Sequence, residues 1–198
     1  MGLIKKIRVS YNSPIVLTFV LLCLGATILG IATQGKSTLQ FFSVYSRSLA
    51  DPSTYVSLFS HVLGHVDLAH FVNNAMMLLL VGPMLEEKYG SKSILELILA
   101  TAFITGVVHC LVSPRTSLCG ASGVAFAFIV LASFASVKQG EIPLSAVLVV
   151  ILFLGNELYS GITVHDNVSN LTHIVGGFVG LAAGIALGEK GPRSGSAR

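Results

Sequence analysis

Residues Gly120-Ala121-Ser122-Gly123 place a serine between two glycines, and the uncharged run Val124–Val137 follows at once. An uninterrupted apolar run of this length predicts a buried helix, with the serine in its first turn. A second apolar stretch, Val168–Gly188, has His173 as its one ionisable side chain. A serine on one helix and a histidine on another are the minimum for a nucleophile and its base. The two stretches therefore predict a nucleophilic site between two membrane helices.

The composition of this 198-residue chain is typical of a membrane protein. Apolar residues make up 53% of it and charged residues 11%, whereas soluble domains carry about 25% charged residues. The basic residues are not clustered with aromatic ones and tryptophan is absent, so we expect no nucleic-acid partner. The three cysteines have neither CxxC nor zinc spacing and are interpreted as small apolar residues. The length predicts a single membrane domain over residues 1–198.

Six apolar stretches predict six membrane-spanning helices. A hydrocarbon core of about 30 Å needs roughly 17–25 helical residues, and most of the stretches reach that length. The stretches are Ile15–Ala32, Ala69–Leu85, Ile94–Val112, Leu118–Val137, Pro143–Leu158 and Val168–Gly188. Residues 34–60 are polar but carry irregularly spaced aromatic side chains, which predicts a segment lying in the membrane interface. We therefore expect an all-α membrane protein embedded in a lipid bilayer.

The basic residues predict the orientation of this bundle. Six spans put both termini on one side of the membrane. If that side is the cytoplasm, nine lysines and arginines lie in cytoplasmic segments and three lie outside. This distribution agrees with the positive-inside rule. We therefore expect a cytoplasmic N-terminus, a cytoplasmic tail over residues 189–198, and Ser122 and His173 at similar depth near the outer face.

The residues around Ser122 and His173 suit covalent catalysis. The first turn of a helix has unpaired backbone N–H groups and a positive dipole end, which stabilise an oxyanion. Gly120 and Gly123 lack a Cβ atom, so a substrate or a neighbouring helix can come close. His173 shares one helix face with three small residues, which favours tight helix packing; they are Gly176, Gly180 and Gly184. Phe126, one turn after Ser122, could pack under the imidazole ring.

A third group of polar residues precedes and begins the second predicted span. His70 and Asn74 are four residues apart, so they share a helix face, and both could donate hydrogen bonds to an oxyanion. His61 and His65 could instead bind a metal ion together with Asp67. No HExxH motif supplies a general base beside a metal. We therefore expect His61 and His65 to bond loop backbone, and we expect no metal site.

Taken together, these motifs resemble those of the rhomboid intramembrane serine proteases of the minimal six-helix bacterial type. The resemblance covers about residues 59–188 and rests on His61-x3-His65-x4-His70-x3-Asn74, Glu86-x3-Gly90, Gly120-Ala121-Ser122-Gly123 and His173-x2-Gly176-x3-Gly180. The Trp-Arg pair common in the first loop of the family is replaced by Val56-Ser57. Phe126 stands where the family often has a tyrosine.

The resemblance implies both an activity and residue roles. Ser122 would be the nucleophile and His173 the general base, with His70, Asn74 and the Ser122 backbone as the oxyanion hole. Glu86 would be structural. Such proteases cleave transmembrane segments of other membrane proteins near the outer leaflet, without cofactor or metal. We expect a bacterial plasma membrane protein of this kind.

The last span holds no Asp or Glu to orient His173, so a two-residue dyad is favoured over a triad.

Two other functions are compatible with parts of the sequence. A non-catalytic binder or chaperone of membrane proteins could use the same scaffold, although inactive relatives typically lack the serine or the histidine. A small transporter would need ionisable groups near the middle of several helices, and the first, fourth and fifth spans have none there.

Overall fold

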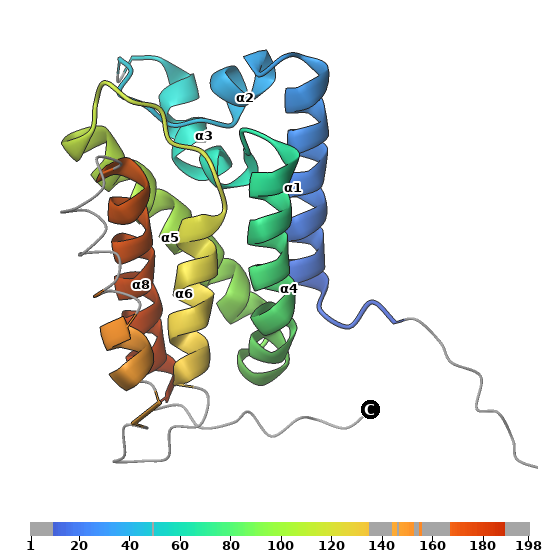
Figure 1. The fold of residues 1–198 in the computed structure, drawn as a ribbon, viewed down its shortest axis with the longest axis vertical. Helices are drawn as coiled ribbons and strands as arrows, with labels where there is room; N and C mark the ends of the chain where they lie inside the picture. The colour runs from blue at the N-terminus through green and yellow to red at the C-terminus, as the bar shows by residue number, and fades with distance from the viewer. Residues whose placement is uncertain are drawn as a thin grey trace, which may run out of the picture.

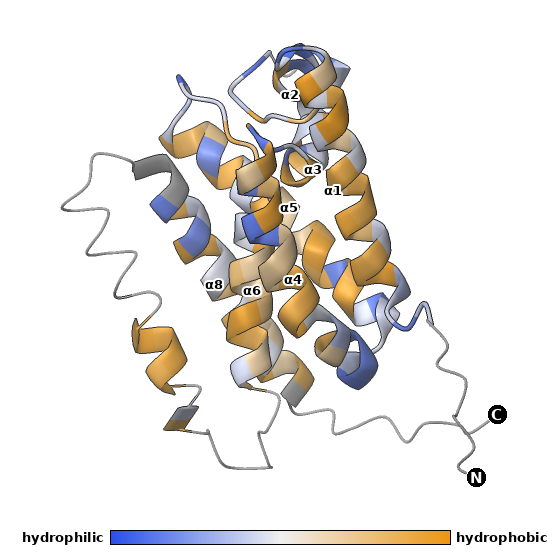
Figure 2. Cartoon of the chain, turned by 45° about the vertical axis from the view of Figure 1, so that its right-hand side comes forward, coloured by the Kyte–Doolittle hydropathy of each residue, from blue (hydrophilic) through white to orange (hydrophobic). Residues whose placement is uncertain are grey.

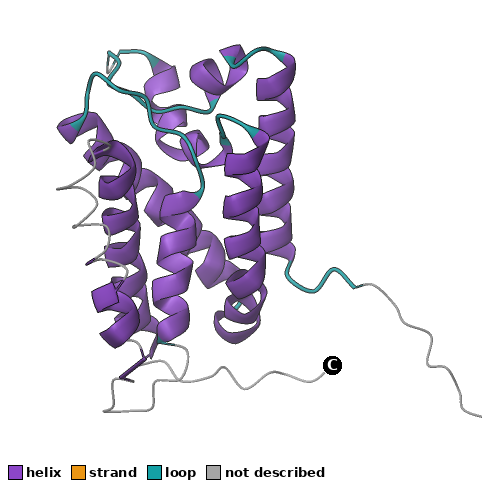
Figure 3. Cartoon of the chain, in the orientation of Figure 1, coloured by secondary structure: helices purple, strands orange, loops and turns teal. Residues whose placement is uncertain are grey.

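The computed structural model describes residues 10–48, 50–134, 144–145, 147–152, 155 and 167–188. The described elements are helices joined by short loops (Figures 1 and 3). They are α1 (Pro14–Ala32), α2 (Lys36–Phe41), α3 (Pro52–Ser60), the 3-10 helix η1 (His61–Leu63), α4 (Leu68–Tyr89), α5 (Ser91–Val112), α6 (Ser122–Ser133) and α8 (Asn167–Gly188). The expectation of an all-helical chain is therefore confirmed for these residues.

Four of the described helices are long and apolar enough to cross a membrane, namely α1, α4, α5 and α8. They correspond to the first, second, third and sixth predicted spans. Most of α1 is hydrophobic, whereas hydrophilic residues gather in the loops beside α2 (Figure 2). Within the predicted fifth span, residues 144–145, 147–152 and 155 are helical, and the remainder lies outside the described residues.

The predicted start of the fourth span at Leu118 is wrong, because α6 begins at Ser122. Leu118 instead pairs with Val44 in an isolated antiparallel bridge, with both N···O distances 2.9 Å. Gly120 follows with φ of +134°, a backbone conformation that is incompatible with a right-handed helix. An extended segment therefore leads into α6, and Ser122 becomes its first helical residue. The predicted end at Val137 lies outside the described residues.

Helix α6 forms the centre of the bundle. It lies between α4 and α8, with α5 behind it (Figure 1). Eight of its twelve residues are buried, as expected for a helix that is apolar on every face. They include two phenylalanines, of which Phe128 is fully buried. The neighbouring helices therefore separate most of α6 from lipid, and its first turn is positioned by packing on several sides.

Helices α6 and α8 touch through their backbones. A Cβ atom on Gly176 would collide with the carbonyl oxygen of Gly123, and one on Gly180 would collide with the carbonyl oxygen of Ala127. One turn further along, a Cβ on Gly184 would lie 2.8 Å from the Phe134 ring. Small residues at successive turns allow this approach, as is common between membrane helices. The glycine face predicted on the last span is thus the face that packs on α6.

Glu86, near the end of α4, fixes the start of α1. Its carboxylate oxygens accept hydrogen bonds from the backbone N–H groups of Ile15 (3.0 Å) and Val16 (2.9 Å). The Ser91 hydroxyl, in the first turn of α5, donates to the same carboxylate at 2.6 Å. A negative charge at a helix N-terminus satisfies unpaired N–H groups and is favoured by the helix dipole. One buried side chain therefore holds three helices together.

Arg47 anchors the segment between α1 and α4. Its guanidinium group lies 4.0 Å from the centre of the Tyr45 ring and donates to the Ser53 hydroxyl at 2.8 Å. A cation over an aromatic face is attracted by the ring quadrupole. The family's Trp-Arg pair is replaced by Val56-Ser57, but this segment still has an arginine that binds both an aromatic ring and polar groups.

We expect the Gly180→Ala substitution to destabilise the bundle. The added methyl group meets the Ala127 backbone, and overpacking of this kind typically costs about 1–3 kcal/mol. Thermal unfolding in detergent measures the loss. Gly25→Ala is the control, because no atom lies within 4 Å of its Cβ position and alanine is favoured over glycine in a helix by about 0.5–1 kcal/mol. Equal stability of the two variants would contradict the close backbone contact.

Candidate active site

Ser122 is the first residue of α6, and Ala121 is the N-cap. Its side chain is partly exposed, whereas Gly123 and the five residues that follow it are buried. The N–H groups in the first turn of a helix have no partner within that helix, and the dipole gives this end a partial positive charge. Ser122 therefore stands where negative charge developing on a bound carbonyl oxygen would be stabilised.

Two hydrogen bonds hold the turn that precedes Ser122. The Gly120 N–H donates to the carbonyl oxygen of His61 at 3.0 Å, and the Ala121 N–H donates to Nε2 of His65 at 3.4 Å. A Cβ atom on Gly120 would lie 2.9 Å from Cε1 and 3.0 Å from Nε2 of His70. Glycine is therefore required at position 120 both for its positive φ and for the ring packed against it.

His61 and His65 are neutral and bond backbone carbonyl groups, that of His61 lying within α5 rather than in a loop as expected. Nε2 of His61 lies 3.0 Å from the Ala102 carbonyl oxygen, and Nδ1 of His65 lies 3.2 Å from that of Leu63. A carbonyl oxygen can only accept, so each of these ring nitrogens carries the proton. Burial lowers the pKa of both side chains to about 4. His65 therefore keeps a free lone pair on Nε2 to accept the Ala121 N–H.

His173, on α8, lies against the first turns of α6. Its imidazole stacks on the Phe126 ring, with 4.2 Å between ring centres and 6° between the planes. One residue earlier, Thr172 is in contact with Gly123, since a Cβ there would lie 3.1 Å from Cγ2 of Thr172. Gly123, which follows Ser122, therefore contacts Thr172, which precedes His173. The packing of Phe126 under the imidazole agrees with the sequence-based expectation.

His70 and Asn74, on α4, approach the same place from the opposite side. His70 packs against Gly120 and is close enough to His173 for an electrostatic interaction. Asn74 is 2% exposed, and its Nδ2 lies 4.0 Å from the Cβ position of Gly120. This amide nitrogen has no hydrogen-bond partner among the described residues. A buried donor without a partner is uncommon, and this one is available to a substrate oxygen.

Sequence reasoning missed two threonines that support this site. The Thr27 hydroxyl, on α1, donates to the Cys23 carbonyl at 2.7 Å and lies 3.4 Å from Nδ1 of His65. It can therefore share the proton on that nitrogen. Thr172 fills the space beside Gly123. Neither residue was singled out, because a threonine within an apolar stretch is not by itself a functional signal.

We expect stability to fall as the pH decreases from about 6.5 to about 4. The pKa of His61 and of His65 is about 4 in the folded chain, whereas an unfolded histidine titrates near 6.5. The unfolded state therefore binds more protons in this window, which lowers the free energy of unfolding. Thermal unfolding in detergent across this pH range measures the effect. His65→Gln should show a smaller pH dependence, and an unchanged dependence would contradict a neutral, buried His65.

Comparison with known proteins places this chain in one family. A family model described as the Rhomboid domain matches residues 52–190, which is most of the chain. Rhomboid protease GluP of Bacillus subtilis (strain 168) is 26% identical over 154 residues, or 76% of this chain. The aligned part covers 30% of that relative, so the chain spans less than a third of its length. Four helices in the described part of the chain are long and apolar enough to cross a membrane, and this chain is an integral membrane protein that belongs to the rhomboid family.

Proposed function

We propose that this protein is an intramembrane serine protease that hydrolyses peptide bonds in or near transmembrane segments of membrane proteins. Ser122 and His173 form its catalytic dyad. The observation that carries the proposal is the stacking of His173 on Phe126, one turn after Ser122, at 4.2 Å. This contact sets the histidine beside the first turn of α6, within the part of the chain that matches the rhomboid family.

The dyad would work by nucleophilic catalysis. His173 accepts the hydroxyl proton while Ser122 Oγ bonds to the carbonyl carbon of the scissile peptide. The tetrahedral intermediate then collapses, the C–N bond breaks, and His173 returns the proton to the leaving amine. Water, activated by the same histidine, hydrolyses the acyl-enzyme and frees Ser122. The flat stacking on Phe126 restricts rotation of the imidazole, a task that a third triad residue performs in other serine proteases.

The oxyanion of the intermediate would be bound by groups from two helices. The Ser122 N–H lies at the positive end of α6, and Asn74 offers a buried amide nitrogen that has no partner among the described residues. His70 packs on the intervening Gly120 and could supply a further donor. Donors already fixed in place stabilise the developing charge without reorganisation during the reaction. The bonds from His61 and His65 to the preceding turn support this arrangement.

The proposed protease is a single six-helix domain of a bacterial plasma membrane. Both termini would be cytoplasmic, as the excess of basic residues on that side favours. The active site would then lie towards the outer face, below the segment that contains α2 and α3. Its partners would be the bilayer and transmembrane protein substrates. The similarity to a relative named as a rhomboid protease supports the protease function.

A non-catalytic binder of membrane proteins remains the second candidate function. A binder could have the same helix bundle and the same contacts between helices. The Asn74 amide, which has no partner in the described part of the chain, favours the protease, because a binder has no oxyanion to stabilise and a buried donor without a partner would only cost stability.

A fluorescent fluorophosphonate tests the dyad directly. Purified protein in detergent should be labelled, because an activated serine attacks the phosphorus atom, whereas Ser122→Ala and His173→Ala should not be labelled. The same two variants should lose cleavage of a model transmembrane substrate. Thermal unfolding of each variant controls for folding. Labelling that persists in Ser122→Ala would remove Ser122 from the proposed dyad, and a folded wild type that neither labels nor cleaves would favour the binder.

Asn74→Ala tests the oxyanion donor. Removal of one such donor typically lowers kcat by about 10²–10³, while KM should change little because the interaction forms in the transition state. Asn73→Ala is a matched control, since its neighbouring amide is exposed and should leave kcat unchanged. Cleavage kinetics in detergent or liposomes measure both variants. Equal kcat values would remove Asn74 from the proposed oxyanion hole.

A further inference from the structure

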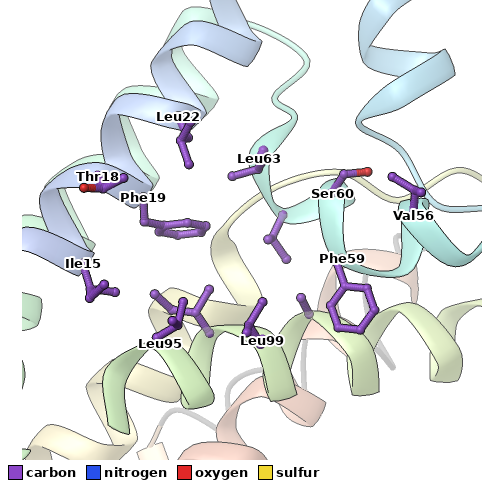
Figure 4. A pocket seen from close by; sticks show the side chains of 13 residues that line it. Ile15, Thr18, Phe19, Leu22, Val56, Phe59, Ser60, Leu63, Leu95 and Leu99 are labelled. Atoms are coloured by element: carbon purple, nitrogen blue, oxygen red, sulfur yellow. The ribbon is translucent and has the colours of Figure 1, made fainter. Parts of the chain in front are cut away.

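An apolar groove of about 460 Å³ lies between α1, α5 and the α3–η1 segment, away from Ser122. Ile15 and Leu22 of α1 form one wall, and Leu95 and Leu99 of α5 form the other (Figure 4). Its volume falls within the range of about 300–1,000 Å³ that is usual for sites that bind small molecules. Leu22 is 54% exposed and Leu99 is 44% exposed, so the groove opens at the surface of two membrane-spanning helices.

The α3–η1 segment closes the groove at one end. Val56 and Phe59 of α3 and Leu63 of η1 line it there (Figure 4). Along α1, the lining runs from Ile15 to Leu22, which is about 10 Å at 1.5 Å per helical residue. Half of a hydrocarbon core is about 15 Å thick. A transmembrane helix needs the full thickness and cannot pass this closed end, whereas a single acyl chain ends within one leaflet.

The open end of the groove has groups that suit a lipid headgroup. Lys92 precedes Leu95 by one helical turn on α5; its side chain is 81% exposed and pairs with Glu96 at 3.7 Å. Just before α1, the Tyr11 hydroxyl lies 2.9 Å from that of Thr18 on α1, which also lines the groove. Lysine and tyrosine at the ends of membrane helices lie at the level of the headgroups. A phosphate there would compete with the Glu96 carboxylate for the exposed Lys92 ammonium group.

We propose that one acyl chain of a membrane phospholipid occupies this groove, with its headgroup at the end marked by Tyr11 and Lys92. The lining is apolar, the surrounding medium at this depth is hydrocarbon, and the length fits one leaflet. The proposal does not depend on protease activity, because none of the lining residues belongs to the proposed dyad or oxyanion hole.

The bound chain would support the back of the candidate site. Val62 and Ala102 line the groove, and the carbonyl oxygen of Ala102 binds the His61 ring at 3.0 Å. The carbonyl oxygen of His61 in turn holds the Gly120 N–H. An acyl chain packed against Val62 and Ala102 therefore fills space directly behind the segment that positions the turn before Ser122.

Tryptophan fluorescence can detect this lipid, since the natural sequence has no tryptophan. Phe59→Trp places a reporter in the groove, and Phe178→Trp places one on the outer surface of α8. The two phenylalanines are 43% and 56% exposed. Each variant is titrated in detergent with phosphatidylglycerol brominated on its acyl chains, which quenches nearby tryptophan. Quenching of Phe59→Trp should saturate at stoichiometric lipid, while quenching of Phe178→Trp should follow the overall lipid fraction of the micelle.

A second measurement needs no fluorescent reporter. Leu99→Trp fills the groove, and Leu80→Trp, at an 82% exposed position of α4, adds the same side chain elsewhere. After gel filtration in mild detergent, wild type and Leu80→Trp should retain phospholipid phosphorus that Leu99→Trp has lost. Identical titration curves for the two reporters, or equal phosphorus in all three proteins, would overturn the proposal. A groove covered by a second copy would instead protect Phe59→Trp from quenching and give a dimer that Leu99→Trp dissociates.

Discussion

Backbone contact between α6 and α8 is the constraint on which the candidate site depends. Apolar side chains gain little by leaving lipid for one another, so membrane helices associate mainly through close packing. Gly176 and Gly180 let α8 approach the carbonyl oxygens of Gly123 and Ala127, and this approach fixes the register of the two helices. In that register the His173 ring lies flat on Phe126, next to the turn that carries Ser122.

The candidate site also depends on the backbone turn before Ser122, which uncharged groups hold in place. His61 and His65 contribute a carbonyl oxygen and a neutral ring nitrogen to the N–H groups of Gly120 and Ala121. Charged groups would be costly in so buried a place, and unsatisfied backbone groups would be costly as well. Each of these two buried histidines is neutral and donates its ring proton to a carbonyl oxygen. They therefore satisfy the backbone N–H groups of the turn without adding a charge, and α6 begins directly after it at Ser122.

Helix α1 is attached to the rest of the bundle at two levels. Glu86 binds its first turn, and about two to three helical turns further along Cys23 and Thr27 contact the η1 segment and His65. Over the first part of α1, the apolar groove lies between this helix and α5. Polar contacts at these two levels therefore fix the position of α1. The apolar groove beside it has a lining that suits an acyl chain of the bilayer. This arrangement links the lipid environment to the segment behind the candidate site.

The sequence alone determined the helical membrane class, four of the spans and the residues that could react, because apolar length and residue type are local properties of the chain. It also indicated which face of the last helix would pack, through the spacing of its glycines. It could not show that Leu118 pairs with Val44, so that α6 begins at Ser122, or that Thr27 and Thr172 support the site. The Arg47 anchor, the Glu86 cap and the groove were likewise decided by tertiary structure, since each joins segments far apart in the chain and no local pattern records such contacts.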